Sequence, residues 1–107
     1  MVVSRFEVYL VNLDQTIGSE IKKTRPCLVI SPNEVNRHIA TVIVATMTTQ
    51  SRDYPTRLNL NFQGKEGQVV LDQIHTVDKE RLVRKLGEID QEVQKKVLAI
   101  LAELFAE

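Results

Sequence analysis

The sequence contains few of the residues that usually carry redox chemistry or bind metal ions. It has one cysteine, Cys27, two histidines and no tryptophan among its 107 residues. A lone cysteine cannot form a disulfide within the chain. Because a CxxC pair and a histidine cluster are also missing, we expect no zinc site, no other metal and no cofactor. No apolar run approaches the ~20 residues that a membrane-spanning helix needs.

The chain also lacks net charge. Its 14 lysines and arginines balance its 14 aspartates and glutamates, whereas a protein that coats nucleic acid is usually basic. A role on nucleic acid would therefore require a local basic patch, for which the candidates are Lys22, Lys23, Arg25, Arg52 and Arg57. The first residues lack the charged start, apolar stretch and cleavage site of a secretory signal, so we expect a cytoplasmic protein.

What the chain does contain is a succession of short β-rich segments. Its length, without repeats or linkers, indicates a single domain over residues 1–107. Between the strands we expect a long loop at 14–24 and a polar connection at 32–38. The predicted strands are residues 6–13, 26–31, 40–48, 57–62, 68–77 and 82–89.

The pattern changes period near the end of the chain. Asp78 is placed to cap one helical turn at 79–82, and Asp90 to cap a longer helix that follows it. Apolar residues then recur three and four positions apart, from Val93 to Phe105, which predicts an amphipathic helix. Short strands followed by one helix predict a mainly β fold, a small antiparallel barrel that the helix closes or covers.

Polar residues gather where the apolar strands end, and they are the candidates for a functional site. Arg25 precedes the second strand, Thr48 ends the third and Ser51 follows it, and Asp72, Gln73 and His75 interrupt the fifth. Taken singly, each has an ordinary structural explanation as a turn former or a solvated charge. The adjacent pair Asp72 and Gln73 is harder to explain, because neighbours in a strand point to opposite faces and one must face the interior or a site.

Three longer stretches are distinctive: "GSE" followed by "RPCLVISP", then "VIVATMTTQSRDYPT", then "DQIHTVDKERLVRKLGEI". With these stretches the sequence resembles the MazF/PemK family of toxin endoribonucleases. The resemblance covers nearly the whole chain, in the right order and spacing. It implies an SH3-like antiparallel barrel of the CcdB/PemK type with a C-terminal helix. It also implies a homodimer, metal-independent cleavage of single-stranded mRNA, and a partner antitoxin that blocks the RNA groove.

The resemblance assigns roles to individual residues. The family's catalytic arginine and threonine fall on Arg25 and Thr48. The "GSE" loop, here Ser19 and Glu20, is expected to hold RNA and select its sequence. The same expectation of RNA binding applies to the remaining candidates, which are Ser51, Asp72, Gln73 and His75.

The chain departs from the family pattern in two places. Many members have Gly-Asp where this chain has Phe6-Glu7, and many have a Gln-Gly-Gly run where it has Ile21-Lys22-Lys23. Glycines would give the loop conformational freedom that the three present residues lack. The change at Ile21-Lys22-Lys23 therefore bears on which RNA motif is recognised. The Arg25–Thr48 pair is intact.

RNA carries its own nucleophile, because the 2′-hydroxyl can attack the adjacent phosphorus and release a 5′-hydroxyl end. An arginine fork such as that of Arg25 matches phosphate geometry and keeps its charge, and Pro26 favours an extended Arg25. Thr48 can donate a hydrogen bond to the same phosphate. For the proton acceptor, Glu20 and His75 remain open beside Arg25 itself.

Two other functions stay open at this point. One is a non-cleaving module of the same fold that binds RNA or an antitoxin, which the altered loop at Ile21-Lys22-Lys23 keeps in play. The other is a gyrase poison, because a related toxin family shares the fold. The matching residues are those of the RNA-cleaving branch, which favours the endoribonuclease.

Overall fold

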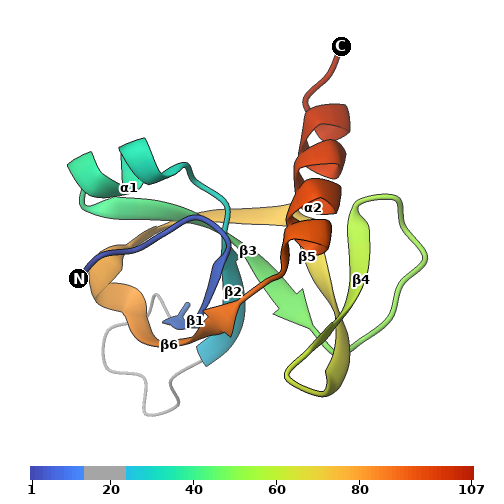
Figure 1. The fold of residues 1–107 in the computed structure, drawn as a ribbon, viewed down its shortest axis with the longest axis horizontal. Helices are drawn as coiled ribbons and strands as arrows, with labels where there is room; N and C mark the ends of the chain where they lie inside the picture. The colour runs from blue at the N-terminus through green and yellow to red at the C-terminus, as the bar shows by residue number, and fades with distance from the viewer. Residues whose placement is uncertain (14–23) are drawn as a thin grey trace.

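The computed structural model describes residues 1–13 and 24–107 and shows a strongly curled sheet with a helix along one side (Figure 1). The strands are β1 (Glu7–Asn12), β2 (Thr24–Val29), β3 (Thr41–Thr48), β4 (Arg57–Phe62), β5 (Lys65–Asp78) and β6 (Leu82–Glu88). The helices are α1 (Asn33–His38), the short 3-10 turn η1 (Lys79–Arg81) and α2 (Gln91–Leu104). None of these helices is long and apolar enough to cross a membrane.

All six predicted strands are present, and they form one sheet in the order β4-β5-β3-β2-β1-β6. Every neighbouring pair runs antiparallel. The nearly continuous apolar strand β3 is central, because it pairs with β2 on one side and β5 on the other. The turn between β4 and β5 is made by Gln63 and Gly64, which both take left-handed backbone angles, and β5 starts at Lys65.

The sheet has an apolar cluster on each face, which follows from the period-two alternation of its strands. Val8 and Tyr9 are neighbours in β1 and belong to different clusters, as do Cys27 and Leu28 in β2. One cluster takes its strand residues from β1, β2, β3, β5 and β6. The other, which we call the helix-side cluster, lies under α2 and contains Val97, the fully buried residue of that helix.

Helix α2 begins as the sequence predicts. The carboxylate of Asp90 accepts a hydrogen bond from the Val93 N–H at 2.9 Å, and Asp78 caps the η1 turn through the Glu80 N–H in the same way. Such a cap is worth about 1 kcal/mol. Burying Val97 contributes about 1.5–3 kcal/mol more, so α2 is held by its start and by its apolar face.

Helix α1 was not predicted, since residues 32–38 have only a polar pattern. Its one buried residue is Asn36, which donates from Nδ2 to the Ser31 carbonyl at 2.9 Å. The Ser31 hydroxyl donates to Asn36 Oδ1 and accepts from the Ile43 N–H, and Lys79 donates to the Asn36 carbonyl. Tertiary hydrogen bonds, rather than local sequence pattern, therefore stabilise this short helix.

The two edge strands of the curled sheet approach each other at the β4–β5 hairpin. The side-chain amide of Gln63 donates to the Leu86 carbonyl of β6 at 2.5 Å. The ring of Phe62 lies so close to Gly87 that a β-carbon there would stand 3.1 Å from it. Side-chain contacts thus close the barrel at this end. In the described residues, no backbone ladder joins the edge strands β4 and β6.

An ion pair joins β1 to β6 near the start of the fold. Glu7 is only 7% exposed, and its Oε1 accepts from the Ser4 N–H at 2.6 Å and the Tyr9 hydroxyl at 3.3 Å. Its Oε2 lies 2.6 Å from Lys85 Nζ. Burial acts to raise the pKa of Glu7, but the bonds from Lys85, Ser4 and Tyr9 outweigh it and hold that pKa below its ordinary value.

This arrangement predicts a pH-dependent stability difference for Glu7→Gln. Because the folded-state pKa is depressed, the contribution of Glu7 is present above the ordinary value of 4.5 and is lost as the pH falls through the folded-state value. At pH 7 the variant should melt roughly 4–8 °C lower, the shift that corresponds to about 1 kcal/mol in a domain of this size. Thermal melts from pH 7 to pH 3 should show the gap closing.

The exposed carboxylate of Glu66 provides the matched control, and Glu66→Gln should track the parent at every pH. A gap between Glu7→Gln and the parent that stays constant down to pH 3 would contradict the ion-pair explanation.

Candidate phosphate-binding site at the end of the β2–β3 ladder

The register of β2 on β3 brings Arg25 and Thr48 to the same place. Cys27 pairs with Thr46 in this antiparallel ladder, and continuing the register by two residues sets Arg25 opposite Thr48. Within the described strands, β3 pairs only with residues 27–29 of β2, so the ladder ends before Pro26. Proline can therefore lie within β2, contrary to its expected place at the strand start, because its missing N–H faces no partner from β3.

Arg25 and Thr48 border a hollow of about 420 Å³, which we call the polar hollow. It lies on the face of the sheet that carries Cys27, beyond the point where the apolar cluster of that face ends. Its lining includes the polar residues Arg25, Thr46, Thr48, Arg52, Gln73 and His75. The sequence-predicted residues Gln73 and His75 therefore lie with the Arg25–Thr48 pair.

A bulge in β5 shapes the side of the hollow that Gln73 occupies. Ala45 pairs with Ile74, whereas the next residue, Thr46, pairs with Val70, so residues 71–73 leave the ladder. Asp72 and Gln73 consequently do not alternate between the two faces, as expected for an unbroken strand, and both are exposed. The Thr46 hydroxyl donates to Gln73 Oε1 at 3.2 Å and turns this side chain toward the hollow.

Asp72 has a different environment from Gln73. Its Oδ1 accepts from the Thr56 hydroxyl at 2.9 Å and from Arg57 Nε at 3.1 Å. Desolvation acts to raise the pKa of Asp72, but the bonds from Arg57 and Thr56 outweigh it and lower that pKa. The Arg57 guanidinium also lies 5.3 Å from the ring centroid of Tyr54, so Asp72 and Tyr54 together hold one arginine beside the hollow.

The loop at 49–56 borders the hollow above the end of β3. Thr48 Oγ1 accepts from the Gln50 N–H at 3.1 Å, and the Tyr54 carbonyl accepts from the Arg57 N–H at 3.0 Å. Ser51 lines an adjoining cavity of about 490 Å³ rather than the polar hollow. Ser19 and Glu20, the remaining predicted RNA-binding residues, lie outside the described residues.

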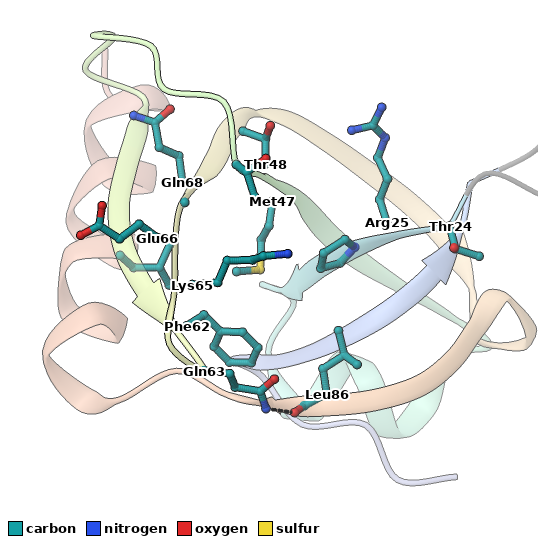
Figure 2. Close-up of a pocket in the computed structure, with 14 residues that line it drawn as sticks. Thr24, Arg25, Met47, Thr48, Phe62, Gln63, Lys65, Glu66, Gln68 and Leu86 are labelled. Atoms are coloured by element: carbon teal, nitrogen blue, oxygen red, sulfur yellow. Dashed lines mark hydrogen bonds between the residues drawn. The ribbon is translucent and has the colours of Figure 1, made fainter.

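A larger cavity of about 750 Å³ continues from the polar hollow, and Arg25 and Thr48 line both. Figure 2 shows these two side chains and Gln68 directed to one side of it, with Phe62 and Gln63 at the opposite side. Met47 and Phe62, with Leu60 and Leu86, give this cavity an apolar surface. An extended ligand could therefore place a charged group at Arg25 and an apolar group beside it.

The charged side chains that line the polar hollow are arginines. Arg25, Arg52 and Arg57 line it, and none of the described residues that line it is acidic. This local excess of cations exists although the chain as a whole is neutral. Guanidinium groups with hydroxyl and amide donors between them are suited to bind a phosphate. In the described part of the chain, no His, Cys, Asp and Glu residues gather in a group of three that could hold a metal ion.

Cys27 belongs to the core, in agreement with its position in an apolar strand. It is fully buried, and burial raises the pKa of its thiol to about 12. Arg25, two residues away, acts in the opposite direction but does not offset burial. The thiol is thus unsuited to act as a nucleophile, although it lies directly behind the site.

Two residues beside the site were missed from the sequence, Gly67 and Gln68. A β-carbon on Gly67 would stand 2.6 Å from the Thr48 carbonyl oxygen, so the residue must be glycine for β5 to approach the end of β3. Gln68 is buried and pairs with Thr48. Its one available signal was a glutamine at the start of the apolar run "QVVL".

The contact at Gly67 predicts that Gly67→Ala displaces Thr48. The obstructing atom is backbone, so the strands must separate, at a cost of about 1–3 kcal/mol. We expect a lower melting temperature together with shifted amide resonances for Thr48 and Thr49.

Gly64→Ala is the matched control, because Gly64 has φ +80° and nothing within 4 Å of an added β-carbon. It should lower stability through backbone strain and leave the Thr48 resonance in place. An unshifted Thr48 resonance in Gly67→Ala would disprove the positioning role of Gly67.

Comparisons with known proteins bear on what this site is for. A family model described as "PemK-like, MazF-like toxin of type II toxin-antitoxin system" matches residues 4–105. Endoribonuclease EndoA of Bacillus subtilis (strain 168) is 36% identical over 103 residues, which cover 91% of this chain and 89% of EndoA.

Solved structures share the fold. An endoribonuclease in complex with its cognate antitoxin from mycobacterial species superposes with a TM-score of 0.82 at 30% identity, covering 94% of this chain and 92% of that one. A MazE–MazF structure from Deinococcus radiodurans gives 0.83 at 25% identity, covering 97% and 96%. These neighbours confirm the expected barrel with a C-terminal helix, and the chain belongs to the PemK-like, MazF-like toxin family of type II toxin–antitoxin systems.

Proposed function

We propose that this chain is the toxin of a type II toxin–antitoxin pair and acts as a metal-independent, sequence-specific endoribonuclease on single-stranded mRNA. The observation that carries the proposal is that Arg25 and Thr48 line one hollow, which is lined by further arginines and, in its described residues, by no acid. The similarity to Endoribonuclease EndoA supports the same chemistry. Cleavage of mRNA would inhibit translation and growth.

In this proposal the RNA phosphate lies between Arg25 and Thr48. The 2′-hydroxyl attacks the phosphorus, the bond to the 5′ oxygen breaks, and the ends are a 2′,3′-cyclic phosphate and a 5′-hydroxyl. Arg25 stabilises the charge on the phosphoryl oxygens. Thr48 Oγ1 already accepts a hydrogen bond from the Gln50 N–H, so its own proton is left to donate to the phosphate.

The other predicted residues bind RNA or position a neighbouring side chain around the Arg25–Thr48 pair. Gln73 and His75 line the hollow, and because Thr46 occupies Gln73 Oε1, its amide nitrogen is the group it offers to RNA. Asp72 positions Arg57 from the rim, and Ser51 borders the adjoining cavity. Ser19 and Glu20 in the "GSE" loop complete the proposed RNA-binding set, with Glu20 and His75 as candidate proton acceptors.

We also propose that the toxin is a cytoplasmic homodimer with a cognate antitoxin as its protein partner. The mycobacterial relative was solved in complex with its cognate antitoxin, and the Deinococcus protein as a MazE–MazF complex. The substrate supports the location, because mRNA is translated in the cytoplasm.

The direct test is cleavage of a long RNA in EDTA, with the ends mapped by sequencing. We expect cuts at one short motif. Arg25→Ala and Thr48→Ala should each lower kcat/KM by about 100- to 1,000-fold, the usual effect of removing one preorganised donor. Arg84→Ala and Thr41→Ala are the matched controls, because both residues lie outside the cavities at the site.

RNA that is bound but left intact by the parent protein would disprove cleavage and favour the non-cleaving module. DNA breaks that depend on gyrase, with RNA intact, would favour the gyrase poison.

The role of His75 has a separate test in the pH dependence of kcat. If His75 contacts phosphate without moving a proton, His75→Ala should raise KM about three- to tenfold and leave the shape of the kcat profile unchanged. Loss of one limb of that profile would instead assign proton transfer to His75. His38→Ala, an exposed histidine on α1, is the control and should match the parent.

A further inference from the structure

Gln68 is a polar residue at the start of a buried run of β5 whose other members are apolar. It is 3% exposed, and it precedes the buried residues Val69, Val70 and Leu71 of β5. Burying an amide costs about 1–3 kcal/mol in proteins unless hydrogen bonds compensate. The bonds that Gln68 makes therefore indicate why a glutamine occupies this position.

Both ends of the Gln68 amide bind the backbone of one loop residue, Arg52. Oε1 accepts from the Arg52 N–H at 3.1 Å, and Nε2 donates to the Arg52 carbonyl at 2.9 Å. The second Nε2 proton goes to Asn59 Oδ1 at 2.8 Å, which fixes the orientation of the amide. The amide thus gives Arg52 the same donor and acceptor that a neighbouring strand would give it.

These two hydrogen bonds, which we call the Gln68 clamp, hold a residue that belongs to no strand. Residues 49–56 belong to no strand, and Arg52 is exposed. Yet the Arg52 side chain lines the polar hollow together with Arg25 and Thr48. Gln68 pairs with Thr48 through its backbone and binds Arg52 through its side chain. It therefore connects the two sides of the hollow.

We propose that Gln68 is a positioning residue that holds Arg52 where it binds an RNA phosphate in the polar hollow. This inference rests on the proposed function, because it assumes that the hollow receives RNA. Gln68 itself need not touch the substrate. Its effect on RNA binding passes through the backbone of Arg52, whose guanidinium supplies the charge.

The test is a double-variant cycle on RNA cleavage. Gln68→Met keeps the length of the side chain and removes the amide, and it should raise KM about three- to tenfold with kcat nearly unchanged. Arg52→Ala should have a similar effect on KM. If Gln68 acts through Arg52, the double variant should bind RNA no worse than Arg52→Ala alone.

The salt dependence of RNA binding separates a lost phosphate contact from a loss of stability, because only the lost contact changes its slope. Loss of one phosphate contact reduces the slope of log affinity against log salt by about 0.7 for a single strand. We expect this reduction in Gln68→Met and in Arg52→Ala. Thr76→Ala, at an exposed residue of β5 that lines none of the cavities at the site, is the control and should keep the parent slope.

Hydrogen exchange of the Arg52 amide tests the clamp without any variant. The Arg52 N–H should exchange more slowly than the Asp53 N–H, because it donates to a buried oxygen. Equal exchange rates would overturn the clamp, and additive KM effects would overturn the action through Arg52. If the parent binds and cuts RNA but Arg52→Ala matches it, the inference fails while the proposed function stands. If the parent neither binds nor cuts RNA, both fail.

Discussion

The site depends on where the ladder between β2 and β3 stops. The register sets Arg25 across from Thr48, but the hydrogen bonds of the described ladder reach only as far as Cys27 and Thr46. Up to that point the shared face is filled by apolar side chains. Beyond that point the two strands continue, but no described backbone pairing joins them. Alternate residues of a strand lie on the same face, so Arg25 lies on the face of Cys27 and borders the polar hollow. The packed core thus fixes the backbone next to an exposed side chain.

Where the ladder ends, side chains provide the fixed contacts that the backbone no longer supplies. Gln68 holds Arg52, and Asp72 holds Arg57. Gln68 and Asp72 both lie on β5, the long strand whose bulge also exposes Gln73. A chain with zero net charge can in this way present several cations in one place, because the compensating carboxylates lie at the rim or elsewhere on the surface.

Most of the fold could be predicted from the sequence because it follows period-two alternation and recognisable caps. Residues 57–62 alternate strictly and form β4 with those bounds, and Asp78 and Asp90 cap the elements that follow them. Helix α1 could not be predicted, because its stability comes from Asn36 and its bonds to distant residues.

The candidate residues could be named from the sequence, but their arrangement in space could not. Arg25, Thr48, Gln73 and His75 came from polar residues at strand ends and from the family resemblance, and the structure places all four at one hollow. The bulge at 71–73 could not be inferred, because it depends on a register shift against β3 that leaves no local mark in the sequence. Gly67 and Gln68 were missed for the same reason, since their roles arise from contacts with Thr48 and Arg52.

The proposed mechanism requires Arg25 and Thr48 to act on one phosphate. The decisive measurement is a crystal structure with an oligonucleotide that spans a mapped cleavage site and carries a 2′-deoxy sugar there to prevent attack. We expect the scissile phosphate within hydrogen-bond distance of both the Arg25 guanidinium and Thr48 Oγ1. A scissile phosphate bound away from this pair, with Arg25 and Thr48 contacting only solvent or protein, would contradict it.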